Sequence, residues 1–290
     1  MPPVYRLVRL ANGAHSLRSV EHDETFHPVV GPIAEADLLY VGQLRLRERV
    51  RAAAKPFVLW DVGLGAAANA IAVLKATRDL PTPIHLLSFD HTLEPLRFGL
   101  RHAVELGYLE DYQGPLARFL EGARRLELSE ATRTITWDLL LDDFPTLIAS
   151  PTASGLPPPH AVLFDAFSPA TNPEMWTLPL FERLYHRLDP KRPCALPTYS
   201  RSTMLRVTLL LAGFRVGRGH PTGLKEETTI AANVPELIED PLGQDWLARV
   251  RRSTSAEPLR GPRYRQARLS PESWERLQRH PQFMRAAIAD

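Results

Sequence analysis

Residues 57–71, FVLWDVGLGAAANAI, decide the fold of this 290-residue chain. An apolar run leads into Gly63 and Gly65, and a helix-favouring, alanine-rich segment follows at once. Glycines at such a turn let the backbone bend tightly and approach a ligand closely, and the free N–H groups of the helix favour an anionic group. The stretch predicts a strand, a ligand-binding turn and a helix, although a tight turn without a ligand would show the same pattern.

From about residue 56 onward, strand-like and helix-like segments alternate, which is typical of a parallel sheet with helices on its faces. Residues 214–219 and 227–233, on either side of PTGLK (221–225), predict two antiparallel strands at its end. This α/β pattern is the one expected of a class I methyltransferase, a Rossmann-like sheet with a terminal antiparallel hairpin. The other expected strands are 56–62, 84–89, 135–141, 160–166 and 195–199, and the expected helices are 66–77, 93–106, 172–188 and a segment from Ser200 or Ser202 to Gly213.

We expect three regions along the chain. They are an N-terminal extension (1–50), a Rossmann-like core (51–236) and a basic C-terminal extension (237–290). Residues 245–290 hold ten Arg against five Asp and Glu, whereas the whole chain has a net charge of only +2. A basic tail suits a polyanionic partner, and a solvated helix face is the alternative explanation.

Composition excludes several classes of protein. Hydrophobic residues make up 44% of the chain and the mean hydropathy is −0.19, so a membrane-embedded channel or transporter is excluded. The N-terminus lacks the pattern of a signal peptide, so we expect a cytoplasmic protein. The single cysteine, Cys194, excludes a disulfide framework within the chain. The ten histidines are scattered singly, so we expect no metal site and interpret them as surface or packing residues.

Acidic residues follow two of the expected strands. Asp90 ends the second strand about 25 residues after the glycines, where a carboxylate can accept both hydroxyls of a ribose. Asp143 follows the third strand and could receive an adenine amino group. Both have simpler explanations, because Asp90 could cap the next helix and the pair Asp142-Asp143 could form a turn.

The sharpest signal is residues 161–177, AVLFDAFSPATNPEMWT. A buried strand delivers Asp165 at its carboxyl end, beside Phe167, Ser168 and Pro169. This combination suits amine methylation, because the carboxylate can orient an amine while aromatic rings exclude water or attract a cationic methyl donor. A loop that merely ends a core strand is the other interpretation.

With these motifs in place, the chain resembles the methyltransferase domain of the bacterial MnmC family. The likeness is carried by DxGxGxxxN from Asp61, FDAFSPxxNPxxW from Phe164, and TYS…R…LLLAGF…G…KEET further on. It also takes in GAHSL (13–17) and ETFH (24–27), and so covers approximately residues 13–233. Those domains methylate 5-aminomethyl-2-thiouridine at the wobble position of tRNA, with S-adenosylmethionine as methyl donor. No second GxGxxG segment for a flavin oxidase is present, so the chain looks like the stand-alone type.

The resemblance assigns roles to individual residues. It implies that Asp61, Gly63, Gly65 and Asn69 form the methionine-side cofactor loop. Asp90 would hold the ribose and Asp143 the adenine, while Asp165 would stand at the methyl-transfer centre with Phe167 and Pro169 shaping the pocket. The chain departs from the family at Ala66 and Ala67, where a threonine and a third glycine are usual. Alanine at position 67 could crowd the cofactor if φ is positive there.

A tRNA substrate would be held mainly through its phosphates, with the wobble base splayed out of the anticodon loop. Trp176 or Tyr199 could stack on that base, and core packing is the alternative role for both. Arginines in 249–268 or 201–206 could contact phosphates. Three rival functions stay open: a nicotinamide-dependent dehydrogenase, a non-catalytic RNA-binding relative, and a methyltransferase of another amine. The oligomeric state is not predictable from these residues.

Overall fold

The computed structural model describes residues 4–130, 132–223 and 226–284. The end of the PTGLK turn (224–225) and the last residues of the C-terminal extension (285–290) lie outside the described residues. In the described part of the chain, no helix is long and apolar enough to cross a membrane.

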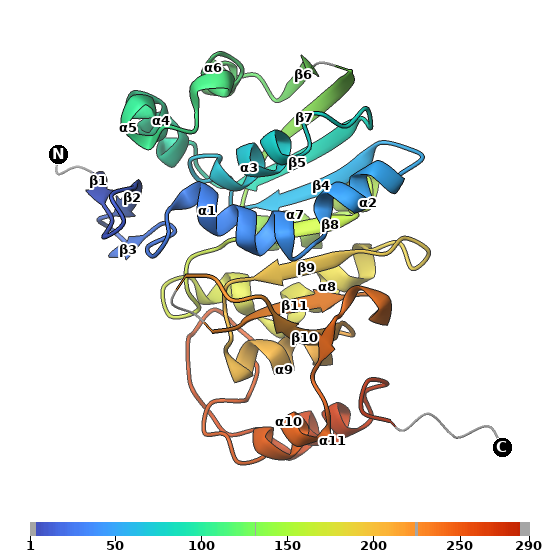
Figure 1. The fold of residues 1–290 in the computed structure, drawn as a ribbon. Coiled ribbons are helices and arrows are strands. Elements are labelled where there is room, and N and C mark those ends of the chain that lie inside the picture. Colours follow the sequence, from blue (N-terminus) through green and yellow to red (C-terminus); the bar gives the residue numbers. More distant parts are fainter. Residues whose placement is uncertain (1–3, 131, 224–225, 285–290) are drawn as a thin grey trace.

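A nine-stranded sheet forms the centre of the molecule (Figure 1). Its strand order is β12-β10-β11-β9-β8-β4-β5-β7-β6. The strands from β9 to β7 are parallel, whereas β11 runs antiparallel to both β9 and β10, which confirms the predicted sheet and terminal hairpin. The bounds are β4 (Phe57–Val62), β5 (Ile84–Asp90), β6 (Arg125–Glu130), β7 (Arg133–Leu141), β8 (Ala161–Phe164), β9 (Ala195–Thr198), β10 (Arg215–Gly219), β11 (Thr228–Ala232) and β12 (Asp240–Pro241).

The strand order reverses at β4. Along the chain, β5 and β7 are added on one side of β4, while β8 and β9 are added on the other. The loops that follow β4 and β8 therefore diverge from the same edge of the sheet, and such an edge is where open α/β sheets bind ligands.

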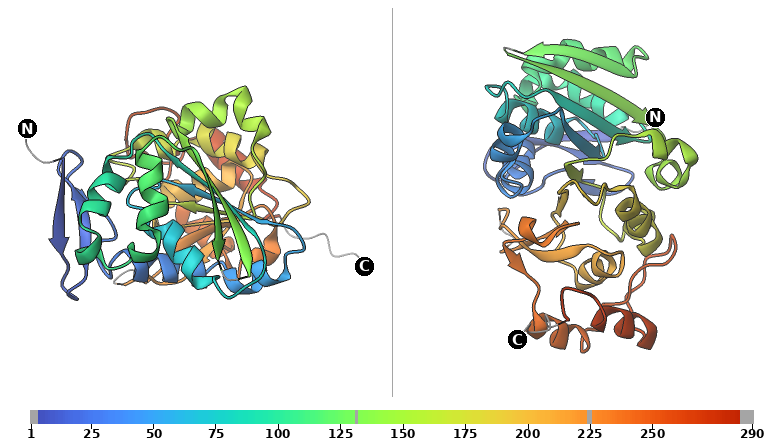
Figure 2. Two further views of the ribbon diagram at one scale, coloured as in Figure 1. Left: turned by 90° about the horizontal axis from the view of Figure 1, so that it is seen from above. Right: turned by 90° about the vertical axis from the view of Figure 1, so that its right-hand side faces the viewer.

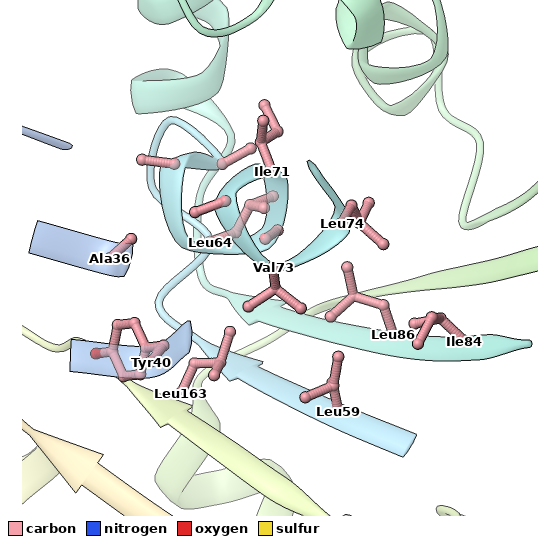
Figure 3. Close-up of a cluster of buried hydrophobic side chains, with 14 of the residues drawn as sticks. Ala36, Tyr40, Leu59, Leu64, Ile71, Val73, Leu74, Ile84, Leu86 and Leu163 are labelled. Carbon is pink, nitrogen blue, oxygen red and sulfur yellow. The ribbon is translucent and has the colours of Figure 1, made fainter. Parts of the chain in front are cut away.

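Helices cover both faces of the sheet, and β4 shows why. Its side chains alternate, so that Phe57 and Leu59 enter one apolar core while Val58, Trp60 and Val62 enter the other. Figure 3 shows the first core, where Leu59 lies among side chains from α3 and from neighbouring strands. The helices are α3 (Ala68–Ala76), α4 (Glu94–Arg101), α5 (Ala103–Leu106), α6 (Gln113–Leu120), α7 (Phe144–Ala149), α8 (Leu178–Arg187) and α9 (Thr203–Leu211).

Several predicted boundaries are wrong. Helix α3 begins at Ala68 instead of 66, because Ala67 has a left-handed backbone (φ 63°) that a helix cannot include. The helix expected over 93–106 divides at His102, and the one expected over 172–188 becomes a 3₁₀ turn (Pro173–Trp176) and α8, separated by an extended Thr177. Strand β8 ends at Phe164, so Asp165 begins a loop. Helices α6 and α7 and the antiparallel edge strand β6 were not predicted.

The N-terminal region has two parts: a small separate sheet, and a helical segment that packs on the large sheet's helix α3. Strands β1 (Tyr5–Arg9), β2 (His15–Ser19) and β3 (Glu24–Thr25) form a small antiparallel sheet. It stands beside the edge at which the parallel strands of the large sheet end (Figures 1 and 2). Helix α1 (Pro32–Ala36), the π-helical segment η1 (Asp37–Gly42) and α2 (Leu46–Ala52) follow it. Because α1 and η1 pack on α3, this part of the predicted N-terminal extension shares the first apolar core.

The C-terminal region is docked onto the far end of the sheet. Strand β12 pairs with β10, and α11 (Pro271–Gln278) packs on α9, while α10 (Gln244–Val250) lies beside it (Figure 1). Gln282 accepts from the backbone N–H of Val216 at 2.8 Å and donates to its carbonyl at 2.7 Å, which fixes the chain after α11 to the edge of the sheet. The region expected as an extension therefore shares the second apolar core.

Candidate functional site

A cavity of about 700 Å³ opens where the parallel strands end. Its wall is built from the loops after β4, β5, β7 and β8, and residues of the small N-terminal sheet also line it. The cavity lies at the point where the strand order reverses, as expected for a ligand site in this type of sheet. Acidic side chains far outnumber basic ones on this wall, so the cavity suits a cationic ligand.

The glycine turn forms the floor of the cavity. Gly63 (φ 94°) and Gly65 (φ 53°) have left-handed backbones, and a Cβ atom at Gly63 would lie 2.8 Å from the carbonyl oxygen of Asp165. Ala67 also has a left-handed backbone, so the condition under which alanine could crowd the cofactor is met. The cavity is nevertheless open with both alanines present. Ala66 forms part of its wall, whereas Ala67 is completely buried and is not part of the lining.

Asp90 connects the end of β5 to this turn. Its Oδ2 accepts from the N–H of Gly65 at 2.9 Å, and its Oδ1 accepts from the N–H of Thr92 at 3.1 Å. Burial raises the pKa of the Asp90 carboxyl, against the lowering effect of these hydrogen bonds. Asp90 also lines the cavity. Each of its carboxylate oxygens keeps a second lone pair, so it can accept a hydrogen bond from a ligand in addition to these local contacts.

Asp61 lies behind the cavity wall. Its side chain is completely buried and is absent from the cavity lining, although the resemblance implied contact with the cofactor. Its Oδ2 accepts from the hydroxyl of Ser88 at 2.7 Å, and burial raises its pKa to about 8. Asp61 therefore ties β4 to β5 beneath the turn, as a mostly protonated acid at neutral pH.

Asp142 and Asp143 line the cavity at the end of β7. Oδ2 of Asp143 accepts from the backbone N–H of Thr146 at 3.0 Å and from its hydroxyl at 2.6 Å, so it caps α7. The cap takes the place of the turn that was the simpler explanation for the Asp142-Asp143 pair. The adenine contact of Asp143 stays a prediction, and its position on the cavity wall is compatible with it.

Asp165 stands on the cavity wall directly after β8, and two side chains approach it. Asn69, on the first turn of α3, donates from Nδ2 to Asp165 Oδ2 at 2.8 Å. Nε2 of His27, from the N-terminal region, lies 3.5 Å from the same oxygen. The side chain of Asp165 is 18% exposed, so the carboxylate remains accessible from the cavity.

The N-terminal residues at the cavity were missed as site residues by sequence reasoning. Glu24 accepts from the N–H of Ser168 at 3.1 Å and from the hydroxyls of Ser168 and Thr171, which anchors the loop after β8. The rings of His22 and Phe26 contact Phe167, with ring centroids 4.5 and 5.3 Å away. The available signal was the motif ETFH, which took part in the resemblance but was assigned no chemistry.

The four predicted substrate-binding residues have different locations. Phe167 and Tyr199 line the cavity, whereas Pro169 is not part of the lining. The expectation that Trp176 stacks on a base is wrong, because its ring is completely buried. Its indole N–H donates to the carbonyl of Phe167 at 2.7 Å, so Trp176 supports the loop from beneath. The hydroxyl of Tyr199 donates to the carbonyl of Ala166 at 3.0 Å.

These residues fit an adenosyl sulfonium ligand. The glycine turn leaves room for close approach, Asp90 and the Asp142-Asp143 pair offer acceptors at the ends of neighbouring strands, and the acidic wall suits a positive charge. A pyrophosphate, as in a nicotinamide cofactor, would meet this acidic wall unfavourably. The sheet, with β11 antiparallel to its neighbours, and this site define the fold of the class I S-adenosyl-L-methionine-dependent methyltransferases.

Comparison with known proteins gives the same class. A family described as S-adenosyl-L-methionine-dependent methyltransferase matches residues 109–234, which include Asp165. The chain is 28% identical over 222 residues to the tRNA 5-methylaminomethyl-2-thiouridine biosynthesis bifunctional protein MnmC of Ralstonia nicotianae, covering 74% of this chain and 32% of that protein. It is 29% identical over 228 residues to MnmC of Cupriavidus metallidurans, with 75% and 32% covered. The chain thus spans about a third of these curated relatives.

Among solved structures, MNMC2 from Aquifex aeolicus superposes with a TM-score of 0.68. The two chains are 24% identical, and the match covers 94% of this chain and 82% of that one. These findings confirm the resemblance to the MnmC methyltransferase domain, and S-adenosyl-L-methionine is the cofactor of the class.

Proposed function

We propose that this protein is an S-adenosylmethionine-dependent N-methyltransferase that acts on the 5-aminomethyl group of wobble (2-thio)uridine in tRNA. The observation that carries the proposal is the position of Asp165 on the wall of an open cavity, beside the glycine turn and hydrogen-bonded by Asn69. The names of the MnmC relatives, which refer to tRNA 5-methylaminomethyl-2-thiouridine, support this choice of acceptor.

Within this proposal, the bound cofactor supplies an electrophilic methyl group on a sulfonium. The backbone of Gly63 and Gly65, together with Asn69 and Asp90, would hold it. Displacement at a methyl carbon requires an oriented lone pair more than acid catalysis, so positioning of the amine is the main task of the protein. Asp165 accepts hydrogen bonds from the amine and fixes its direction, while Asn69 holds the carboxylate in place. Phe167 and Tyr199 exclude water from the wall around it.

An arginine loop next to the site supports an RNA substrate. Leu259 pairs with Thr177, directly after Trp176, and the backbone N–H groups of Ala256 and Glu257 both donate to the carbonyl of Ala267. These anchors hold the loop formed by residues 260–268, which we call the arginine loop, beside the segment that follows β8. Its exposed side chains include Arg263, Tyr264, Arg265 and Arg268. Arginines interleaved with an exposed aromatic ring suit phosphates and an unstacked base.

The alternative arginine segment, 201–206, contributes less than expected. Arg206 is buried, donates to Glu227 at 3.0 Å and to Thr229 at 3.0 Å, and so is not available to phosphate. Arg201 is exposed. We therefore assign phosphate binding mainly to the exposed arginines of 249–268, with the loop 260–268 at their centre.

The test is mass spectrometry of wobble nucleosides after incubation of the protein with hypomodified tRNA and S-adenosylmethionine. We expect 5-methylaminomethyl-2-thiouridine to form with the wild-type protein. Asp165→Asn should lower turnover at least 100-fold while S-adenosylhomocysteine binding, measured by calorimetry, changes little. Methylation of a small amine in place of the tRNA would support the rival acceptor, and wild-type turnover by Asp165→Asn would remove the assigned role of this carboxylate.

A further inference from the structure

His27 reaches the candidate methyl-transfer site from the N-terminal region. It lies two residues after the end of β3, its side chain is only 8% exposed, and its Nε2 lies 3.5 Å from Oδ2 of Asp165. It also lines the cavity. A residue 138 positions before Asp165 in the chain is thus placed against the carboxylate that the proposed function uses.

The backbone at His27 is strained. Its φ is 47°, in the left-handed region that few non-glycine residues adopt. Pro28 follows, and the residue before a proline ordinarily has an extended backbone. Contacts on the N-terminal side hold this conformation: the N–H of Phe26 donates to the carbonyl of Leu17 at 2.8 Å, and the hydroxyl of Ser16 donates to the carbonyl of Phe26. Strain maintained in this way clusters at functional sites.

We propose that His27 is the proton acceptor that converts the substrate ammonium into the nucleophilic amine. The inference rests on the proposed function, because only an amine substrate needs this step. An N–H bond of the ammonium breaks, its electron pair stays on nitrogen as the attacking lone pair, and the proton binds to Nε2 of His27. The resulting imidazolium is balanced by the carboxylate of Asp165. The methylated product leaves as a secondary ammonium ion, and His27 returns its proton to solvent through the open cavity.

The other titratable groups around this part of the cavity are less suited. Glu24 is held by Ser168 and Thr171. Burial and the nearby Asp165 raise the pKa of the Tyr199 phenol well above its ordinary value, so it stays protonated at neutral pH. Tyr40 behaves in the same way for the same two reasons. Glu35 also lines the cavity and adds negative charge near these groups. Two imidazoles line this part of the wall: His22 packs against Phe167, whereas His27 lies against Asp165. Imidazole is the side chain that most often serves as a general base, so the placement favours His27.

His27→Asn is the decisive variant. Asparagine accepts the left-handed region more readily than other non-glycine residues, so the fold and thermal stability should be kept, while the side chain can no longer take up a proton. We expect kcat for tRNA methylation to fall at least 100-fold. The affinity for S-adenosylhomocysteine, measured by calorimetry without substrate, should change less than threefold. The decrease in wild-type kcat toward acid pH should disappear in the variant.

A second variant tests proton transfer directly. His27→Gly removes the ring and the backbone strain together, and added imidazole should restore turnover in proportion to its concentration. Rates independent of imidazole, or wild-type kcat in His27→Asn, would overturn the inference. So would a loss of S-adenosylhomocysteine binding in His27→Asn, since that shows a structural role. If the wild-type protein itself fails to methylate tRNA, the proposed function fails first, and the two outcomes remain distinct.

Discussion

The α-carbon of Gly63 faces the carbonyl oxygen of Asp165 so closely that a Cβ atom would lie 2.8 Å from it. The glycine turn after β4 and the loop after β8 therefore approach each other through backbone atoms, and a side chain at Gly63 cannot fit between them. This contact links the two segments on which the site depends.

Gly63→Ala should damage the site in two ways, because the new methyl group meets the backbone of Asp165 and φ is 94°. We expect at least a tenfold loss of S-adenosylhomocysteine affinity by calorimetry and a lower melting temperature. Gly107→Ala is the matched control, since its φ is 70° but no atom lies within 4 Å of the added Cβ. The control should lose stability through strain and keep affinity. Equal losses of affinity in both variants would refute the contact as the cause.

Ala67→Gly should be tolerated despite removing a buried methyl group. The left-handed backbone at Ala67 costs about 1 kcal/mol, and glycine relieves it. Ala72→Gly, within α3, has no such gain and should lose about 1 kcal/mol or more. Chemical denaturation should therefore find Ala67→Gly at least about 1 kcal/mol more stable than Ala72→Gly. The reverse order would show that the backbone at position 67 is not strained.

The pKa of Asp61 leads to a prediction about stability and pH. Burial raises this pKa from 3.8 in the unfolded chain to about 8 in the folded protein. Between these values the folded state holds a proton that the unfolded state has lost, so the free energy of unfolding falls as pH rises and levels off above about 8. The slope from this one group is at most about 1.4 kcal/mol per pH unit.

Asp61→Asn isolates this effect. The variant keeps an oxygen for Ser88 but cannot ionise, so its stability relative to wild type should increase steadily from pH 5 to pH 8. His160 and His280, whose pKa values burial lowers to about 4, contribute the opposite slope below pH 6.5. They are common to both proteins and cancel in the difference. A stability difference that stays constant across this range would contradict the raised pKa.

The arginine loop should account for much of the salt dependence of tRNA binding. Replacing Arg263, Arg265 and Arg268 with Ala should weaken binding at least tenfold and reduce the slope of log K against log salt by about 2. Arg125→Ala, on β6 at the opposite end of the sheet, is the control and should leave both unchanged. The affinity for S-adenosylhomocysteine, measured by calorimetry, should be the same in all of these variants as in the wild-type protein. An unaltered salt slope in the triple variant would place the RNA elsewhere on the surface.

The sequence alone predicted most strands of the sheet, its terminal hairpin and part of the candidate site. Local signals carried these predictions. The periodicity of apolar residues indicated the strands and helices. The glycines at 63 and 65 and the acids Asp90 and Asp165 could be recognised because each follows or ends a predicted strand. The resemblance added Asn69, and the structure places it against Asp165.

Only the tertiary structure decided the rest, because it depends on contacts between distant segments and on burial. Glu24 contacts Ser168, which lies 144 residues later in the chain, and His27 contacts Asp165, which is similarly far away in sequence. Neither role is therefore visible in the local sequence. In the sequence, Trp176 and Arg206 look available to bind RNA. In the structure, Trp176 is completely buried and Arg206 forms an ion pair with Glu227. Short-range patterns specify the backbone path, while the free energy of burial, summed over the whole fold, determines which side chains remain exposed for chemistry.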